Sequence, residues 1–166
     1  MLSGIETVSE AMNDEIAYAF LNKCMKEEIL PTIGENEESI TFANSVSDRF
    51  RNPFIAHKWR SIALNSVSKF SVRVLPTLLE YKEQNGAYPK GLTLSLANLI
   101  YFYKNDNPDD NADVVATMKN DSIADILKNS SLWASDISDL TEIVTEYYNK
   151  IDTMGAKETM KWILSE

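Results

Sequence analysis

The residues of this chain best suited to bind a charged ligand are the basic side chains between Arg49 and Pro76. No Asp or Glu occurs between Asp48 and Glu80, although the whole chain has 25 acidic and 16 basic residues. The segment contains Arg49, Arg51, Lys58, Arg60, Lys69, Arg73 and the only histidine, His57. Cations that are kept away from carboxylates retain hydrogen-bond donors for an anionic ligand. We therefore predict a site for a carboxylate or a phosphate group in this segment.

Polar side chains recur in this segment at steps of four residues. They are His57, Ser61, Asn65 and Lys69. In a continuous helix this spacing keeps side chains on roughly one side, so the four would form one wall of a pocket. The apolar and small residues on the other side would face the core, and they are Trp59, Ile62, Ala63, Ser66 and Phe70. An ordinary solvated helix face has the same pattern, so both interpretations stay open.

No complete set of catalytic residues is visible in the chain. A nucleophilic triad needs a base, and neither Cys24 nor a glycine-flanked serine lies near His57 in the sequence. The five glycines are too scattered to form a G-x-G-x-x-G motif or a P-loop. One histidine and one cysteine do not make a metal cluster. We expect no catalytic, cofactor-binding or metal site within this chain alone.

The elements that position these residues are predicted to be helices. Glycine and proline are scarce, with five of each, and alternating strand patterns are rare. Thr7 to Glu10 has the form of a capping box, and Pro31 is expected to stop the helix that follows Asp14. The other predicted helices cover about 37–51, the central segment, 76–85, 92–103, 113–119, 123–128, 140–151 and 156–164. The fold class is therefore all-α, a single multi-helix bundle whose 92–103 helix is apolar nearly all round and buried.

Length and composition are those of one globular domain, 1–166. The net charge of −9 argues against nucleic-acid partners and against docking on an anionic membrane. The only cysteine, Cys24, excludes an internal disulfide and favours a reducing, cytoplasmic location. The longest apolar runs are far shorter than a membrane span.

Three longer motifs resemble a known family. They are TVSEAMND at 7–14, RFRNPFIAH at 49–57 and SIALNSVSKF at 61–70, with RVLP following at 73–76. Together they resemble the C-terminal domain of the mannitol dehydrogenase-like family, the long-chain polyol and uronate dehydrogenases, and within it the tagaturonate reductases (altronate oxidoreductases). The resemblance covers the first half of the chain well and the second half only in general character.

The resemblance implies roles for individual residues. Mannitol-type relatives contact their substrate through an arginine and a lysine, two helical turns apart, at positions that match Ser61 and Lys69. Lys69 agrees with that pattern and Ser61 does not, which favours a uronate reductase over a mannitol dehydrogenase. The expected substrate-binding residues are Lys69 first, then Asn65, Ser61 and His57.

The resemblance also implies what this chain lacks. Relatives bind NAD with an N-terminal Rossmann domain, and their catalytic lysine, asparagine and histidine lie just upstream of the segment matching Gly4 to Asp14. We therefore expect the chain to be the substrate-binding domain of a longer enzyme and inactive by itself. Its partners would be a sugar-acid substrate and the Rossmann domain of the same polypeptide. The implied reaction is the reduction of tagaturonate to altronate by NADH.

Two alternatives remain open. The first is another member of the family, such as a fructuronate reductase or a mannitol-1-phosphate dehydrogenase, in which the anion would be a different carboxylate or a phosphate. The second is not an enzyme: an acidic helical module that binds a protein partner.

Overall fold

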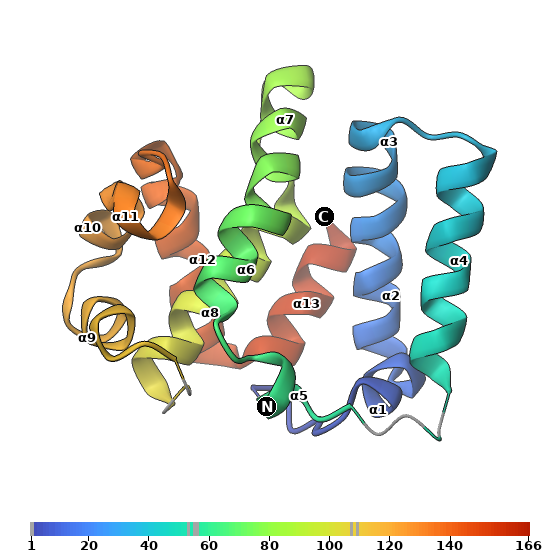
Figure 1. Cartoon of the computed structure of the whole chain (residues 1–166), viewed down its shortest axis with the longest axis horizontal. Helices are drawn as coiled ribbons and strands as arrows, with labels where there is room; N and C mark the ends of the chain where they lie inside the picture. The colour runs from blue at the N-terminus through green and yellow to red at the C-terminus, as the bar shows by residue number, and fades with distance from the viewer. Residues whose placement is uncertain (1, 53, 55–56, 107, 109) are drawn as a thin grey trace.

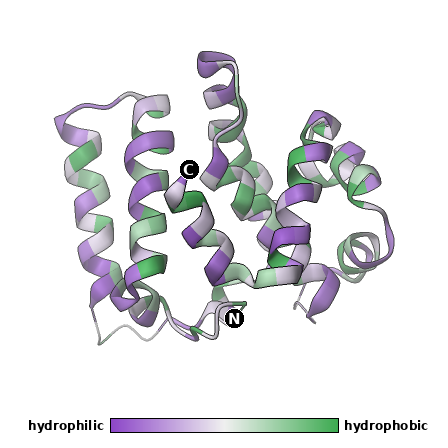
Figure 2. Ribbon diagram, turned by 180° about the vertical axis from the view of Figure 1, so that it is seen from behind, coloured by the Kyte–Doolittle hydropathy of each residue, from purple (hydrophilic) through white to green (hydrophobic). Residues whose placement is uncertain are grey.

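The all-α prediction is confirmed by the computed structural model, which describes residues 2–52, 54, 57–106, 108 and 110–166. Within these residues no strand occurs, and the single β-bridge joins Thr7 to Lys58. Figure 2 shows hydrophobic and hydrophilic residues interleaved along the helices, as expected for helices that bury one face. No helix in the described part of the chain is long and apolar enough to cross a bilayer.

The first helices begin at the caps that the sequence predicts. In α1 (Val8–Asn13) the Thr7 hydroxyl accepts a hydrogen bond from the Glu10 amide at 3.2 Å, while Glu10 accepts one from the Thr7 amide at 3.1 Å. The Asp14 carboxylate caps α2 (Glu15–Lys23) by accepting from the amides of Ile16 and Ala17. The capping-box prediction is therefore confirmed.

The prediction that Pro31 stops the second helix is wrong. After α2 the chain continues as a π-helix (Cys24–Ile29) and then as α3 (Leu30–Ile33). The Leu30 amide donates to the carbonyl of Met25, five residues earlier, and Pro31 falls in the first turn of α3, where a missing amide hydrogen is tolerated. The helix ends instead at Gly34, and α4 (Glu37–Arg51) follows, packed on α1.

The remaining helices follow the predicted order. They are α5 (Trp59–Ile62), α6 (Ser66–Arg73), α7 (Leu75–Asn85), α8 (Lys90–Asn105), α9 (Ala112–Asn120), α10 (Ile123–Lys128), α11 (Ser130–Trp133), a 3-10 turn (Ser138–Leu140), α12 (Thr141–Met154) and α13 (Ala156–Ser165). Gly86 and Gly155 end α7 and α12 with positive φ, as expected for glycine after a helix.

Helix α8 lies at the centre of the domain. Leu94, Leu96, Ala97, Ile100 and Tyr103 have no exposed surface, and α8 packs against α9, α12 and α13. The prediction of a buried helix at 92–103 is confirmed, because a helix that is apolar nearly all round needs neighbours on every side.

A continuous helix through the central segment was predicted, and this prediction is wrong. His57 precedes α5, and its carbonyl accepts a hydrogen bond from the Val8 amide at 3.0 Å. Helix α5 ends at Ile62, and Asn65 takes a left-handed conformation with φ of 54° before α6 begins. Asn adopts this conformation more readily than most residues, so a break in the helix at this position costs little free energy. His57, Ser61, Asn65 and Lys69 therefore do not share one helix face.

Candidate functional site

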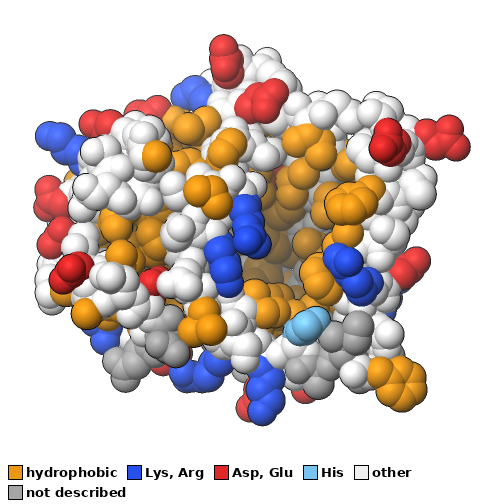
Figure 3. Space-filling model, viewed as in Figure 1, with side chains coloured by type: hydrophobic (Ala, Val, Ile, Leu, Met, Phe, Trp, Pro, Cys, Tyr) orange, Lys and Arg blue, Asp and Glu red, His pale blue; other side chains and the backbone are white. Residues whose placement is uncertain are grey.

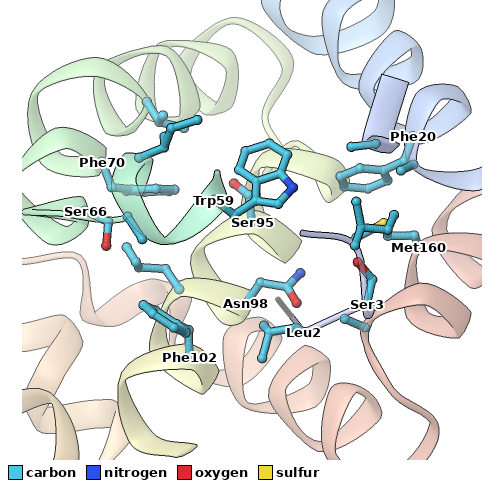
Figure 4. A pocket seen from close by; sticks show the side chains of 18 of the residues that line it. Leu2, Ser3, Phe20, Trp59, Ser66, Phe70, Ser95, Asn98, Phe102 and Met160 are labelled. Carbon is cyan, nitrogen blue, oxygen red and sulfur yellow. The ribbon is translucent and has the colours of Figure 1, made fainter. Parts of the chain in front are cut away.

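A hollow with a mainly apolar lining lies between α2, α5, α6, α8 and α13, beside the N-terminal residues 2–5. Its volume is about 570 Å³. Figure 3 shows the hollow on the face of the molecule, with hydrophobic side chains in its walls and basic side chains beside it. In Figure 4 the aromatic rings of Phe20, Trp59, Phe70 and Phe102 surround the space.

The charged side chains that line this pocket, Lys69 and Arg73, are both cations. The uncharged polar residues of the lining are Ser3, Ser66, Ser95 and Asn98. Among the described residues no Asp or Glu lines the pocket, although the chain carries a net charge of −9. An apolar lining weakens dielectric screening, so the half-buried Lys69 acts on a bound anion more strongly than a surface charge does, whereas Arg73 is exposed.

One stripe of α6 faces the pocket. Ser66, Lys69, Phe70 and Arg73 all line it, and their spacing of three, four and seven residues places them on one side of a helix. Ser68 and Ser71, on the opposite side of α6, line a separate cavity of about 250 Å³. Helix α6 therefore presents both cations to the larger pocket and hydroxyls to the smaller one.

Lys69 is half-buried, and its Nζ donates to the carbonyl oxygen of Ile62 at 2.9 Å. This bond satisfies a carbonyl at the end of α5 and holds the ammonium group in place. An ammonium group has three protons, so two remain for a ligand. Lys69 thus combines a structural role with the capacity to bind an anion.

Ser66 is oriented by a partly buried hydrogen-bond network. Its Oγ lies 3.1 Å from the hydroxyl of Tyr103, which donates to the Asp110 carboxylate. Burial, with a further contribution from Asp110, raises the pKa of Tyr103 to about 12, so the phenol keeps its proton. Because that single proton goes to Asp110, Ser66 must donate to the Tyr103 oxygen. The Ser66 oxygen therefore remains available as an acceptor for a ligand hydroxyl.

Asn98 supplies another acceptor. Its Nδ2 donates to the Leu94 carbonyl at 3.0 Å, whereas its Oδ1 is buried without a hydrogen-bond partner in the described part of the chain. Most buried polar atoms are hydrogen-bonded, so an unpaired acceptor in a pocket lining indicates capacity for a donor that the chain itself does not supply.

The structure brings only one of the four predicted site residues to this pocket. Lys69 lines it, whereas His57, Ser61 and Asn65 are exposed and are not among its described lining residues. The reason is the break at Asn65, which changes the direction in which the preceding residues face. The residues predicted to face the core line the pocket instead: Trp59, Ile62, Ala63, Ser66 and Phe70. Substrate binding by the four predicted residues stays a prediction.

Sequence reasoning missed the contributions of distant helices. Phe20 comes from α2, Ser95 and Asn98 from α8, and Met160 from α13. Periodicity shows which face of each helix is apolar, but it does not show which helices meet. Arg73, one of the basic residues between Arg49 and Pro76, is also a lining residue.

An ion pair joins two of the helices that line the pocket. The Asp14 carboxylate, which caps α2, also accepts a hydrogen bond from Lys157 of α13. The Lys157 ammonium, and next the Ala17 amide, hold the pKa of the Asp14 carboxyl below its usual range. A group whose pKa is lowered by folding stabilises the native state above its unfolded pKa, about 3.9, and loses that contribution as the pH falls through the folded pKa.

Replacing Asp14 with Asn is therefore expected to flatten the acid side of the stability profile. Asn keeps the cap but loses the charge, so Asp14→Asn should lose less stability than the unsubstituted chain between about pH 5 and pH 2. Urea unfolding at a series of pH values measures this difference. Asp48→Asn removes the same charge from the exposed surface of α4 and serves as the control. Parallel profiles for Asp14→Asn and the unsubstituted chain would contradict the expectation.

Comparison with known proteins identifies the domain type. Residues 1–155 match the mannitol dehydrogenase C-terminal domain family. The chain is 38% identical over 151 residues to altronate oxidoreductase of Pectobacterium atrosepticum, covering 90% of this chain and 31% of that protein. It is 35% identical over 182 residues to altronate oxidoreductase of Klebsiella pneumoniae, covering 96% of this chain and 38% of that protein. The chain thus spans less than two fifths of the length of these relatives.

A solved structure has the same fold. Mannitol 2-dehydrogenase of Pseudomonas fluorescens, in a ternary complex with NAD and D-mannitol, superimposes with a TM-score of 0.87. The match covers 99% of this chain and 37% of that protein at 21% sequence identity. The family match over nearly the whole chain and the shared helical architecture lead to one conclusion: this chain belongs to the mannitol dehydrogenase C-terminal domain family.

Proposed function

We propose that this chain is the substrate-binding domain of an NAD-dependent oxidoreductase that interconverts tagaturonate and altronate. The relatives named altronate oxidoreductase support the reaction. The observation that carries the proposal is a pocket whose charged lining residues, Lys69 and Arg73, are both cations in a chain of net charge −9. A sugar acid offers the carboxylate that such a lining would attract.

The described residues of this chain lack the elements of a dinucleotide site. The described residues contain no strand, so they cannot form the βαβ unit that carries a dinucleotide, and the glycines are scattered along the sequence. Under this proposal, NAD is bound by an N-terminal Rossmann domain of the same polypeptide, outside residues 1–166. The present domain binds and orients the sugar acid, which can by itself supply several kcal/mol of the barrier reduction.

Each polar lining residue has a place in this scheme. The two remaining Lys69 protons bind a carboxylate or hydroxyl oxygen of the substrate. The Ser66 oxygen accepts from a substrate hydroxyl. Phe20, Trp59 and the other apolar lining residues exclude water from the carbon backbone of the bound sugar acid.

The position of residues 2–5 supports a second part of the proposal. Leu2, Ser3 and Ile5 line the pocket. A catalytic segment placed just upstream of Gly4, as the family resemblance implies, would therefore reach the substrate at the pocket mouth. The N-terminus lies near α5 and α13 in Figure 1, in agreement with this arrangement.

Turnover by the complete polypeptide tests the proposed reaction. NADH oxidation would be followed with tagaturonate, fructuronate and fructose 6-phosphate at equal concentrations. We expect the highest kcat/KM with tagaturonate. A preference for fructuronate or for fructose 6-phosphate would assign the domain to a different member of the family, and no turnover of any of them would refute the enzymatic proposal.

Lys69→Ala in that polypeptide is expected to lower kcat/KM for tagaturonate. Losing a hydrogen bond to a charged group costs about 1–3 kcal/mol, which is roughly a 5- to 150-fold decrease. Lys128→Ala, which removes an exposed lysine of α10, should leave kcat/KM unchanged. Urea unfolding of both variants shows whether Lys69→Ala also destabilises the fold, as loss of the hydrogen bond from Lys69 to the Ile62 carbonyl would do. Unchanged kinetics for Lys69→Ala would remove this residue from the site.

A further inference from the structure

We propose that Arg73 is the residue that selects a carboxylate-bearing ligand over a neutral polyol in this pocket. The inference rests on the proposed function for its ligand class, a sugar acid. It assigns a specificity role to a side chain that the sequence distinguishes only as one of the basic residues between Arg49 and Pro76.

The placement of Arg73 follows from the helix that carries it. Arg73 is the last residue of α6 and lies one turn beyond Lys69. Both residues line the pocket, together with Ser66 and Phe70 on the same face. Side chains at i and i+4 of a helix are neighbours, so a single carboxylate can lie within reach of both cations.

Arg73 also differs from the other arginines in having no partner within the described chain. Arg60 forms an ion pair with Asp106 at 3.4 Å. Arg51 lies over the Tyr18 ring at 4.3 Å, and Arg49 lies over the Phe50 ring at 5.8 Å. Among the described residues, Arg73 has neither a carboxylate nor an aromatic ring paired with its guanidinium group.

Without a bound anion, the positive charge of Lys69 next to that of Arg73 is unfavourable. Like charges at i and i+4 repel each other, and the described lining contains no acidic residue to offset them. A bound carboxylate removes the repulsion and gains two charge-assisted contacts. A neutral polyol leaves the repulsion in place, so the lysine–arginine pair discriminates between the two ligand classes.

Lys69 and Arg73 differ in the way that each can bind a carboxylate. Lys69 is a point charge with one proton already committed to the Ile62 carbonyl, so it can bind any ligand oxygen. Arg73 has a planar group whose parallel N–H donors match both oxygens of a carboxylate. Selection for a carboxylate therefore depends on Arg73 more than on Lys69.

The test compares two probes that differ only at the terminal group. The isotope-labelled chain is titrated with D-altronate and, separately, with D-altritol, and backbone amide shifts are followed by NMR. We expect saturable shifts in α6 with altronate and weaker binding of altritol. Arg73→Gln should weaken altronate binding roughly ten- to hundred-fold and leave altritol binding unchanged.

Matched variants separate charge from geometry. Arg60→Gln removes the same charge from an exposed arginine outside the pocket lining and should leave altronate binding unchanged. Arg73→Lys keeps the charge but not the paired donors, so its affinity for altronate should fall between those of the unsubstituted chain and Arg73→Gln. Thermal unfolding of each variant shows whether the fold is retained.

The results can refute the role of Arg73 without refuting the proposed reaction, and they can refute the reaction without refuting the role of Arg73. Full affinity of Arg73→Gln for altronate, full affinity of Arg73→Lys, or no saturable shift with altronate would overturn the role of Arg73. Turnover of tagaturonate by the complete polypeptide with an unchanged KM in Arg73→Gln would overturn it as well, while leaving the proposed reaction in place. Loss of altronate binding in Arg73→Gln without any turnover of tagaturonate would support Arg73 and refute the reaction.

Discussion

Glu28→Ala is expected to lower the free energy of unfolding by about 2–4 kcal/mol, because it leaves two buried amide donors without an acceptor. Glu28 is 4% exposed and lies in the π-helix. Its Oε1 accepts from the Gly91 amide at 2.7 Å, and its Oε2 accepts from the Leu92 amide at 2.8 Å. These amides belong to the first turn of α8, and Pro89 at the helix start supplies no side-chain cap.

The carboxylate of Glu28 thus caps α8 from another helix. Burial raises the pKa of this carboxyl, and the hydrogen bonds from Gly91 and Leu92 oppose that rise. The close approach requires glycine at 91, since a Cβ there would lie 2.4 Å from the Cys24 Sγ and 3.0 Å from Glu28 Oε2. Helix α8 carries Ser95 and Asn98 of the pocket, so the cap supports the site as well as the core.

Urea unfolding with matched variants tests this role. Glu28→Gln keeps the shape and one good acceptor, so it should lose less stability than Glu28→Ala. Glu27→Ala is the control, because Glu27 is the preceding residue, its side chain is 61% exposed, and its ion pair with Lys23 lies at the surface. Exposed ion pairs contribute about 0–1 kcal/mol. Equal stability losses at positions 27 and 28 would show that the buried cap is not important.

Trp133→Ala should lower the free energy of unfolding by about 3–5 kcal/mol, the usual range for deleting a buried aromatic side chain. Trp133 is 1% exposed, and its Nε1 donates to the Ile126 carbonyl at 2.7 Å. Its ring meets the edge of Phe70 with centroids 6.2 Å apart. Helix α11 has only four residues, and this ring contact joins it to α6.

The same substitution at a second tryptophan provides the comparison. Trp59 lines the pocket and is half-buried, so Trp59→Ala should destabilise the fold less than Trp133→Ala. Trp133→Phe retains most of the apolar surface but removes the indole donor from the Ile126 carbonyl, which keeps its hydrogen bond from the Asn129 amide, so an intermediate loss is expected. A loss for Trp133→Ala no larger than that for Trp59→Ala would show that the α6–α11 contact is dispensable.

Local signals in the sequence were sufficient to predict most of the helices. The capping box at Thr7, the cap at Asp14 and the glycines at 86 and 155 all act within a few residues of themselves. The buried helix α8 was predictable because its composition requires neighbours on every side. The reversal of charge between Asp48 and Glu80 indicated an anion site, and two of its cations line the pocket.

The composition of the pocket depended on the tertiary structure. Asn65 interrupts the central helix, so His57 and Ser61 lie outside the lining, whereas Trp59 lines the pocket and Phe70 lines it while also packing in the core. Ser95 and Asn98 enter the site only because α8 packs beside α6. The type and spacing of residues determine a helix and its caps, since these interactions connect neighbours in the sequence. The lining of a pocket is decided by which helices meet, and those contacts join residues that no local pattern relates.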